Sequence, residues 1–292
     1  MKITIGIPAY NEEKNIAAII TKLKKITDSI IVCDDGSSDM TSKISQDLGA
    51  RVVTHEKNMG YGAAIKSIFL EAKQIQPDIL VTFDADGQHN VEDIEKVIEP
   101  VQKSTSDIVI GSRFLNEKNK EIPRYRKIGI KTITGLTNTL TGTKISDAQS
   151  GFRAYSKKTL EKITPSDDGM GVSTEILIKS SKLGLVITEV PIKVNYEGDT
   201  STHDPISHGT SVILSTLKFT SIHNPLKFYG IPGLVFLIIG LGFVAWTIQI
   251  YSVEQEIITN ISLIGIGCVV LGSIFLMIAV ILFSIVTVVK EK

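Results

Sequence analysis

The sequence predicts an α/β domain, with a mostly parallel sheet and flanking helices, followed by two transmembrane helices. In the N-terminal part of the 292-residue chain, short apolar runs alternate with amphipathic stretches, as strands and helices do in a parallel sheet. Almost every ionisable residue precedes Phe228, and two long stretches beyond it contain no charged side chain. The length suits one domain of ordinary size with an appendage.

The elements of the sheet domain follow from these runs. The predicted strands are residues 3–7, 29–32, 51–54, 79–83 and 107–110. The predicted helices between them are residues 15–26, 39–48, 61–74 and 91–101. A further helix is expected over residues 173–183, where Glu175 could orient a basic partner. Ligands of such sheets bind beyond the carboxyl ends of the strands, so the residues that follow each strand are the candidates for function.

Residues 231–250 and 261–289 contain no Asp, Glu, Lys or Arg, and each run reaches the roughly 20 residues that a membrane-spanning helix needs. The alternative is a pair of buried core helices, which would be unusual for two such runs with nothing polar to cover them. We therefore expect a domain over residues 1–206, an amphipathic helix at the membrane interface over residues 207–227, and a transmembrane hairpin over residues 228–292.

Lysines flank both outer ends of the hairpin, whereas the loop 252–260 carries two glutamates and no basic residue. The positive-inside rule then places both termini and the domain on the cytoplasmic side of the cell membrane. Nucleic acid is not an expected partner, because Lys plus Arg and Asp plus Glu are each 31. The two cysteines, Cys33 and Cys268, offer neither a disulfide framework nor a thiolate metal site. The oligomeric state is left open.

Acidic residues follow several of the predicted strands. Asp39 and Asn90 are expected to cap the next helices. Capping explains Asp84 and Asp86 poorly, because Asn90 already fills the capping position. Two acids one residue apart, followed by Gln88, supply hard oxygen ligands for Mg²⁺ or Mn²⁺, with a diphosphate to complete the shell.

Six motifs occur in order along the chain: PAYNEE, VCDDGSSD, NMGYGAA, FDADGQH, GSRF and DAQSGFRAY. Together, over about residues 2–196, they resemble glycosyltransferase family 2, and within it the dolichyl-phosphate mannose synthase group. The resemblance implies the GT-A fold, in which a Rossmann-like nucleotide-binding half is joined to an acceptor half. It also implies a nucleotide-sugar donor and, in part of the group, a C-terminal membrane hairpin.

The resemblance assigns residues to the donor. It places Asp86 and Gln88 at the metal, to which the pair of acids adds Asp84 as a third expected ligand. The Gly60 turn would let the backbone approach the donor, although such a glycine alone is more often a turn before a helix. The residues that the resemblance places around the nucleoside are Pro8, Tyr10, Glu12, Asp35 and Asp84.

The resemblance also implies the reaction. A phosphate oxygen of dolichyl or polyprenyl phosphate would attack the sugar carbon in line, with inversion, to accept a single hexose or N-acetylhexosamine. Arg113 and Arg126 match phosphate-binding positions and, with Asp86, are the expected catalytic residues. A solvated basic face near the membrane is the alternative for the cluster of Arg124, Arg126 and Lys127.

The segment 147–153 is expected to form the acceptor-side wall, with Asp147 and Ser150 as its polar contacts. A simple turn is the alternative for its glycine and phenylalanine. The sequence departs from the family pattern at Ile130, where a serine is frequent, and at residues 195–198. The donor is therefore left open between UDP- and GDP-sugars.

Two other functions share parts of this pattern. A processive polysaccharide synthase would need more spans and a QxxRW-like motif, whereas the only Trp lies in a span. A scaffold that binds nucleotide-sugars without catalysis would have no use for a divalent-metal site.

Overall fold

The computed structural model describes residues 1–115, 124–194, 221, 225–255 and 258–290. They belong to two compact units, Met1–Ser215 and Thr216–Lys292. The predicted boundary at residue 206 and the amphipathic helix predicted over residues 207–227 fall mostly outside the described residues. Both stay predictions.

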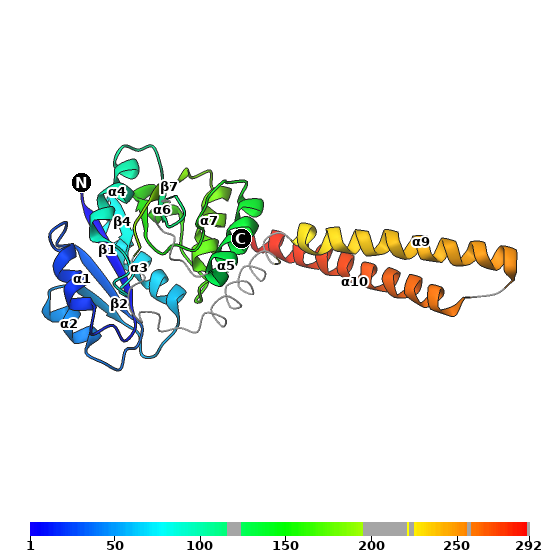
Figure 1. Ribbon diagram of the computed structural model, residues 1–292, viewed down its shortest axis with the longest axis horizontal. Helices are drawn as coiled ribbons and strands as arrows, with labels where there is room; N and C mark the ends of the chain where they lie inside the picture. The colour runs from blue at the N-terminus through cyan, green and yellow to red at the C-terminus, as the bar shows by residue number, and fades with distance from the viewer. Residues whose placement is uncertain (116–123, 195–220, 222–224, 256–257, 291–292) are drawn as a thin grey trace. The chain divides into compact units, whose positions relative to one another are not determined.

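The first unit is built on one sheet. Its strands are β1 (Ile3–Ala9), β2 (Ile30–Asp34), β3 (Arg51–Thr54), β4 (Ile79–Thr82), β5 (Ile108–Ser112), β6 (Arg153–Ser156) and β7 (Ile187–Pro191). They lie in the order β3-β2-β1-β4-β6-β5-β7. Figure 1 labels β1, β2, β4 and β7 of this sheet. β6 runs antiparallel to β4 and β5, and every other neighbouring pair is parallel. The predicted mostly parallel sheet is confirmed, with β6 and β7 added to the five predicted strands.

Helices connect the strands and cover the sheet. They are α1 (Ile16–Leu23), α2 (Thr41–Asp47), α3 (Tyr61–Ile75), α4 (Ile94–Gln102), α5 (Arg124–Thr141), α6 (Lys157–Lys162) and α7 (Val172–Lys182), with the 3₁₀ turn η1 (Val91–Asp93) before α4. The predicted cap at Asn90 is present, because its side chain accepts a hydrogen bond from the N–H of Glu92. The predicted cap at Asp39 is wrong by one residue: Met40 precedes α2 without a capping side chain, and Asp39 accepts a hydrogen bond from the N–H of Thr41 in the turn before the helix. The predicted helices thus begin close to where the sequence indicates.

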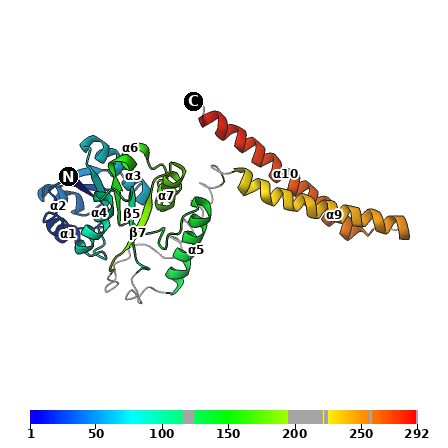
Figure 2. The same cartoon turned by 90° about the horizontal axis from the view of Figure 1, so that it is seen from above.

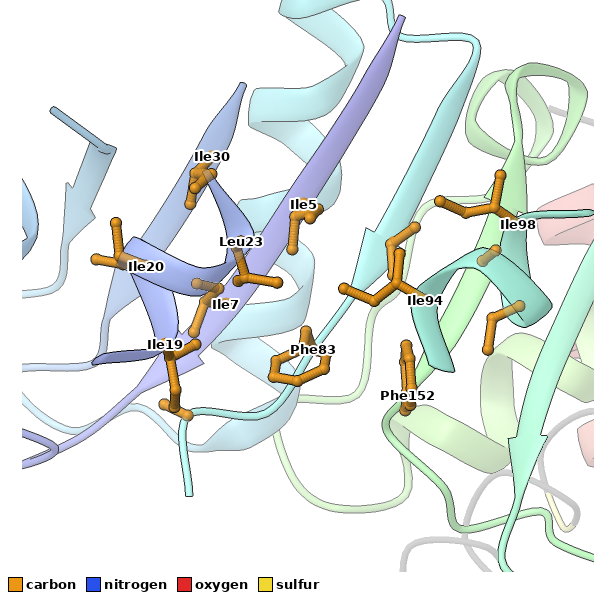
Figure 3. Close-up of a cluster of buried hydrophobic side chains, with 14 of the residues drawn as sticks. Ile5, Ile7, Ile19, Ile20, Leu23, Ile30, Phe83, Ile94, Ile98 and Phe152 are labelled. Atoms are coloured by element: carbon orange, nitrogen blue, oxygen red, sulfur yellow. The ribbon is translucent and has the colours of Figure 1, made fainter. Parts of the chain in front are cut away.

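Apolar side chains form a layer on each face of the sheet. On one face, Ile20 of α1 and Ile94 of α4 pack in the same cluster as Ile5 of β1 (Figure 3). On the other face, α3 and α7 pack on the sheet, and Phe69 of α3 meets Tyr155 of β6 with ring centroids 4.9 Å apart. The sheet is therefore buried on both sides, as parallel sheets are, and its strand ends have fixed positions.

The second unit is a hairpin of two long apolar helices. A π-helical turn η2 (Leu226–Gly230) leads into α9 (Ile231–Glu254), which is followed by α10 (Thr259–Lys290). The two helices lie side by side in both views (Figures 1 and 2). The two helices can approach closely because Gly272 of α10 has no side chain: a Cβ there would lie 2.7 Å from the backbone nitrogen of Leu237 of α9.

Both hairpin helices are long and apolar enough to cross a membrane. Most of their large apolar side chains, such as Ile238 and Leu263, are exposed. A pair of buried core helices would have these side chains covered. The exposure therefore fits the predicted transmembrane hairpin.

Candidate active site

Three neighbouring strands bring acidic residues to one edge of the sheet. β1 lies between β2 and β4 and is parallel to both, so the segments with Glu12, Asp35 and Asp84 leave the sheet beside one another. Burial raises the pKa of Glu12, and the charges of Asp86 and Asp84 raise it further. This edge therefore carries concentrated negative charge.

Asp84 is held between the side chains of Tyr61, from the start of α3, and His89, from later in its own loop. The Tyr61 hydroxyl donates a hydrogen bond to Oδ1 over 3.1 Å, and Nε2 of His89 lies 3.4 Å from Oδ2. Burial opposes ionisation of Asp84, but its hydrogen bonds with His89 and Tyr61, together with nearby positive charge, hold its pKa below the usual range. Gly151 packs on the carboxylate, since a Cβ there would lie 2.7 and 2.8 Å from its two oxygens. Asp84 is thus an ionised carboxylate in a fixed position.

Asp86 and Gln88 follow Asp84 in a tight turn. Oδ1 of Asp86 accepts a hydrogen bond from the N–H of Gln88 over 3.0 Å, and Gln88 is buried. Within the described ranges, no three His, Cys, Asp or Glu side chains are gathered as a complete metal site. The residues nevertheless fit a divalent cation, because Asp84 and Asp86 offer oxygen ligands in a negatively charged place and a diphosphate can supply the rest.

Asp35 organises the loop that leads into α3. Its Oδ1 lies 2.6 Å from Nδ1 of His55 and accepts a hydrogen bond from the N–H of Met59 over 2.9 Å. Its Oδ2 accepts one from the N–H of Gly60 over 2.8 Å. Gly60 has a φ of +102°, which residues with a side chain rarely adopt. Asp35 therefore shapes the glycine loop, and its predicted contact with the nucleoside stays a prediction.

Arg113 follows β5 and is paired with Asp147. Its Nε donates to Oδ2 over 2.7 Å and its Nη2 to Oδ1 over 2.8 Å. Arg113 is 9% exposed and Asp147 is fully buried. Burial alone would raise the pKa of Asp147, but the Arg113 charge and hydrogen bonds hold it below the usual range. The structure shows the Asp147 carboxylate bonded to the Arg113 guanidinium. Asp147 is therefore placed to orient Arg113. The predicted contact of both residues with the acceptor stays a prediction.

Ser150 lies on the same segment as Asp147. It is buried, and its hydroxyl has no hydrogen-bond partner in the part of the chain that the structure describes. A buried hydroxyl without a partner costs about 1–3 kcal/mol, so a ligand or water is its expected partner. The next residue, Gly151, touches Asp84. Ser150 is thus close to the acidic edge and suited to contact a substrate.

For three predicted site residues, the structure describes no side-chain contact that bears on the predicted role. Pro8 lies inside β1, opposite Cys33 of β2, because the strand continues to Ala9 instead of ending at residue 7 as predicted. Tyr10 is partly exposed just after the strand. Arg126 lies in the first turn of α5, and its side chain falls outside the described part. Their roles stay predictions.

Sequence reasoning missed two residues of the site. Tyr61 reaches Asp84 from a segment 23 residues earlier in the chain, and no local pattern links the two. Glu189 of β7 accepts hydrogen bonds from the N–H groups of Ser146 and Asp147. An acidic residue inside the apolar run 185–192 is a signal that a partner must stabilise its charge. That signal could have identified Glu189.

Known proteins are similar to this chain over most of its first unit. The family described as "Glycosyl transferase family 2" matches residues 4–164. The UDP-N-acetylglucosamine–dolichyl-phosphate N-acetylglucosaminyltransferase of Methanococcus voltae is 37% identical over 229 residues, covering 71% of this chain and 89% of that protein. The dolichyl-phosphate hexose transferase of Haloferax volcanii is 31% identical over 220 residues, covering 74% and 92%.

A solved structure has the same fold. Glucosyl-3-phosphoglycerate synthase from Mycobacterium tuberculosis, crystallised with Mn²⁺, uridine diphosphate and glucosyl-3-phosphoglycerate, gives a TM-score of 0.59 at 23% identity. The match covers 74% of this chain and 79% of that one. This likeness confirms the GT-A fold that the sequence motifs implied.

Proposed function

The chain belongs to glycosyl transferase family 2, and we propose that it moves one hexose or N-acetylhexosamine from a UDP- or GDP-sugar onto dolichyl or polyprenyl phosphate. One observation carries this proposal: the unit holds both an acidic edge around Asp84 and Asp86 and a buried, oriented Arg113. The first suits a donor diphosphate with its metal, and the second suits an acceptor phosphate. The relatives named for transfer to dolichyl phosphate support the acceptor.

On the donor side, Asp84, Asp86 and Gln88 would hold Mg²⁺ or Mn²⁺. The bound ion would neutralise the charge that grows on the departing nucleoside diphosphate. The chain's own part is to keep Asp84 ionised and oriented, which Tyr61 and His89 do. The Mn²⁺ and uridine diphosphate of the solved neighbour support a donor of this kind.

On the acceptor side, no strong general base is needed. A phosphate monoester has a second pKa of about 6 and is largely dianionic at pH 7. It must, however, approach a donor that is itself negatively charged, and cations are needed to offset the repulsion. Arg113, held by Asp147, offers a planar guanidinium for this purpose. Arg126 at the start of α5 is proposed as the second cation.

In the proposed reaction, an oxygen of the lipid phosphate attacks the anomeric carbon as the bond from that carbon to the nucleoside diphosphate breaks. Attack in line from the opposite side inverts the carbon. Holding the two reactants in line supplies much of the acceleration. The products are the lipid-phosphate-linked sugar and the free nucleoside diphosphate.

The hairpin of α9 and α10 would anchor the enzyme in the membrane that holds its lipid acceptor. The lysines at its outer ends and the acidic loop between the helices favour a cytoplasmic location for the catalytic unit and both termini. The catalytic unit would then bind both the nucleotide-sugar and the lipid phosphate on the cytoplasmic side of the membrane.

Metal removal and one substitution test this function. Purified full-length protein treated with EDTA should lose transfer from nucleotide-sugar to polyprenyl phosphate, and Mg²⁺ or Mn²⁺ should restore it. Asp86→Asn should abolish transfer with an unchanged melting temperature, because it removes a ligand charge. Asp47→Asn is the matched control, since Asp47 is exposed on α2. Full transfer by the Asp86 variant, or after thorough metal removal, would contradict the proposal.

A further inference from the structure

The backbone of the segment that carries Asp147 is held from several sides. The Glu189 carboxylate accepts hydrogen bonds from the N–H of Ser146 over 2.7 Å and from the N–H of Asp147 over 2.9 Å. From α5, the side chains of Thr134 and Asn138 bond further backbone groups of the same segment. Residues 145–148 therefore have little freedom to move.

Glu189 and Arg113 lie at the same edge of the sheet. β7 runs parallel to β5, with Glu189 opposite Ile110, and Arg113 directly follows β5. Asp147 lies between the two. Its N–H donates a hydrogen bond to Glu189, and its carboxylate accepts two from the Arg113 guanidinium. A continuous set of contacts thus runs from Glu189 through Asp147 to Arg113.

The negative charge of Glu189 is unfavourable at this position. Burial raises its pKa and the charge of Asp147 raises it further, against the hydrogen bonds that it accepts. A carboxylate is the side chain that offers acceptors on both of its terminal atoms and no donor when ionised. Each oxygen can therefore take one of two adjacent backbone N–H groups, whereas an amide in the same position would present its NH₂ to one of them. Packing alone would not require such a charge beside a second carboxylate.

We propose that Glu189 is a positioning residue for the acceptor phosphate: by fixing the backbone at residues 146 and 147 it sets the Asp147 carboxylate, which in turn sets Arg113. Glu189 itself touches no substrate. The inference rests on the proposed function in one respect, namely that Arg113 binds the acceptor.

The test is a kinetic comparison of Glu189→Gln with the unchanged full-length protein. Glutamine keeps the shape, but its amide NH₂ faces one of the two N–H groups. With donor saturating and polyprenyl phosphate varied, the KM for the acceptor should rise about tenfold to a hundredfold, as expected when a binding group is displaced. Donor affinity, measured by titration, should not change. Glu189→Asp keeps the charge on a shorter side chain, and its acceptor KM should lie between those of the unchanged protein and Glu189→Gln.

Glu175→Gln is the matched control for a general loss of structure. Glu175 of α7 likewise accepts hydrogen bonds from two adjacent backbone N–H groups, those of Ser166 and Asp167. That loop does not carry Arg113 or Asp147. The control should lower the melting temperature as Glu189→Gln does and leave the acceptor KM unchanged.

A double-mutant cycle shows whether Glu189 acts through Arg113. In an Arg113→Ala background, Glu189→Gln should raise the acceptor KM no further, because the group that it positions is absent. The same cycle in thermal unfolding needs no substrate, and the losses of melting temperature should not be additive. If the unchanged protein transfers nothing to polyprenyl phosphate, the proposed function fails while the unfolding cycle still tests the contacts. An unchanged acceptor KM in Glu189→Gln, or additive effects in both cycles, would overturn the inference.

Discussion

The Tyr61 hydroxyl donates a hydrogen bond to Oδ1 of Asp84 over 3.1 Å, and Nε2 of His89 lies 3.4 Å from the other oxygen of the same carboxylate. The proposed metal ligand is therefore oriented from both sides by residues outside its own strand. Losing a supporting contact of this kind typically lowers the metal affinity of a site by about tenfold to a hundredfold.

Tyr61→Phe removes the hydroxyl and keeps the ring. It should weaken binding of Mn²⁺ in the presence of uridine diphosphate roughly tenfold, because Asp84 loses the donor that orients it. Electron paramagnetic resonance of free Mn²⁺ measures this without turnover. Tyr251→Phe in the hairpin is the control and should bind as the unchanged protein does. Equal Mn²⁺ affinity in the Tyr61 variant would show that the hydroxyl does not support the site.

Gly151→Ala should lower transfer by about a hundredfold, because a displacement of the order of 1 Å in a reacting group has such an effect. The added Cβ would collide with the Tyr61 hydroxyl and with both oxygens of Asp84. Gly135→Ala is the matched control, since Gly135 is exposed within α5 with no atom close to the new Cβ. The control should keep full activity and gain about 0.5–1 kcal/mol of stability. Normal transfer by Gly151→Ala would mean that Asp84 tolerates displacement.

Asp147→Asn should destabilise the protein at neutral pH by about 3–5 kcal/mol, because it leaves the buried Arg113 without its partner. Since the folded-state pKa of Asp147 is lowered, its carboxylate contributes stability above its unfolded pKa of about 3.9, and this is lost as the pH falls through the folded pKa. The difference in melting temperature between variant and unchanged protein should therefore stay nearly constant from neutral pH down to about pH 4.5 and shrink only as the pH is lowered below about 4. A difference independent of pH would contradict the assigned charge pair.

For topology, a cysteine placed at Val253 should be labelled by an impermeant maleimide added outside intact cells. A cysteine at Ser38, which is exposed on the catalytic unit, should be protected until the cells are opened. Cys268→Ala provides the background, while Cys33 is buried with a pKa raised to about 12 and so will not react. Labelling at position 38 from outside would reverse the proposed orientation.

Much of the fold could be predicted from the sequence because its signals are local. The alternation of apolar runs and amphipathic stretches gives the strands and helices, and the charge-free stretches give the hairpin. Asp84, Asp86 and Gln88 could be selected because they are adjacent in the chain and follow a buried strand.

The support of the site could not be predicted, because it depends on how distant segments meet. The sequence predicts Arg113 and Asp147 each as acceptor contacts, yet only the packing of β5 against β7 shows that they bond each other and that Glu189 accepts the N–H of Asp147. The contact between Gly151 and Asp84 likewise arises where β6 inserts antiparallel beside β4. That reversal of direction has no local signature in the sequence.

The chemical identity of the lipid product tests the central claim most directly. Purified protein with Mn²⁺ would be given polyprenyl phosphate and a panel of UDP- and GDP-sugars, with free polyprenol as the matched acceptor lacking phosphate. Mass spectrometry should show one sugar joined to the lipid through a single phosphate, with one donor preferred and no product from polyprenol. The account would be contradicted by products with several sugars, by a diphosphate-linked sugar, or by no lipid product with any donor.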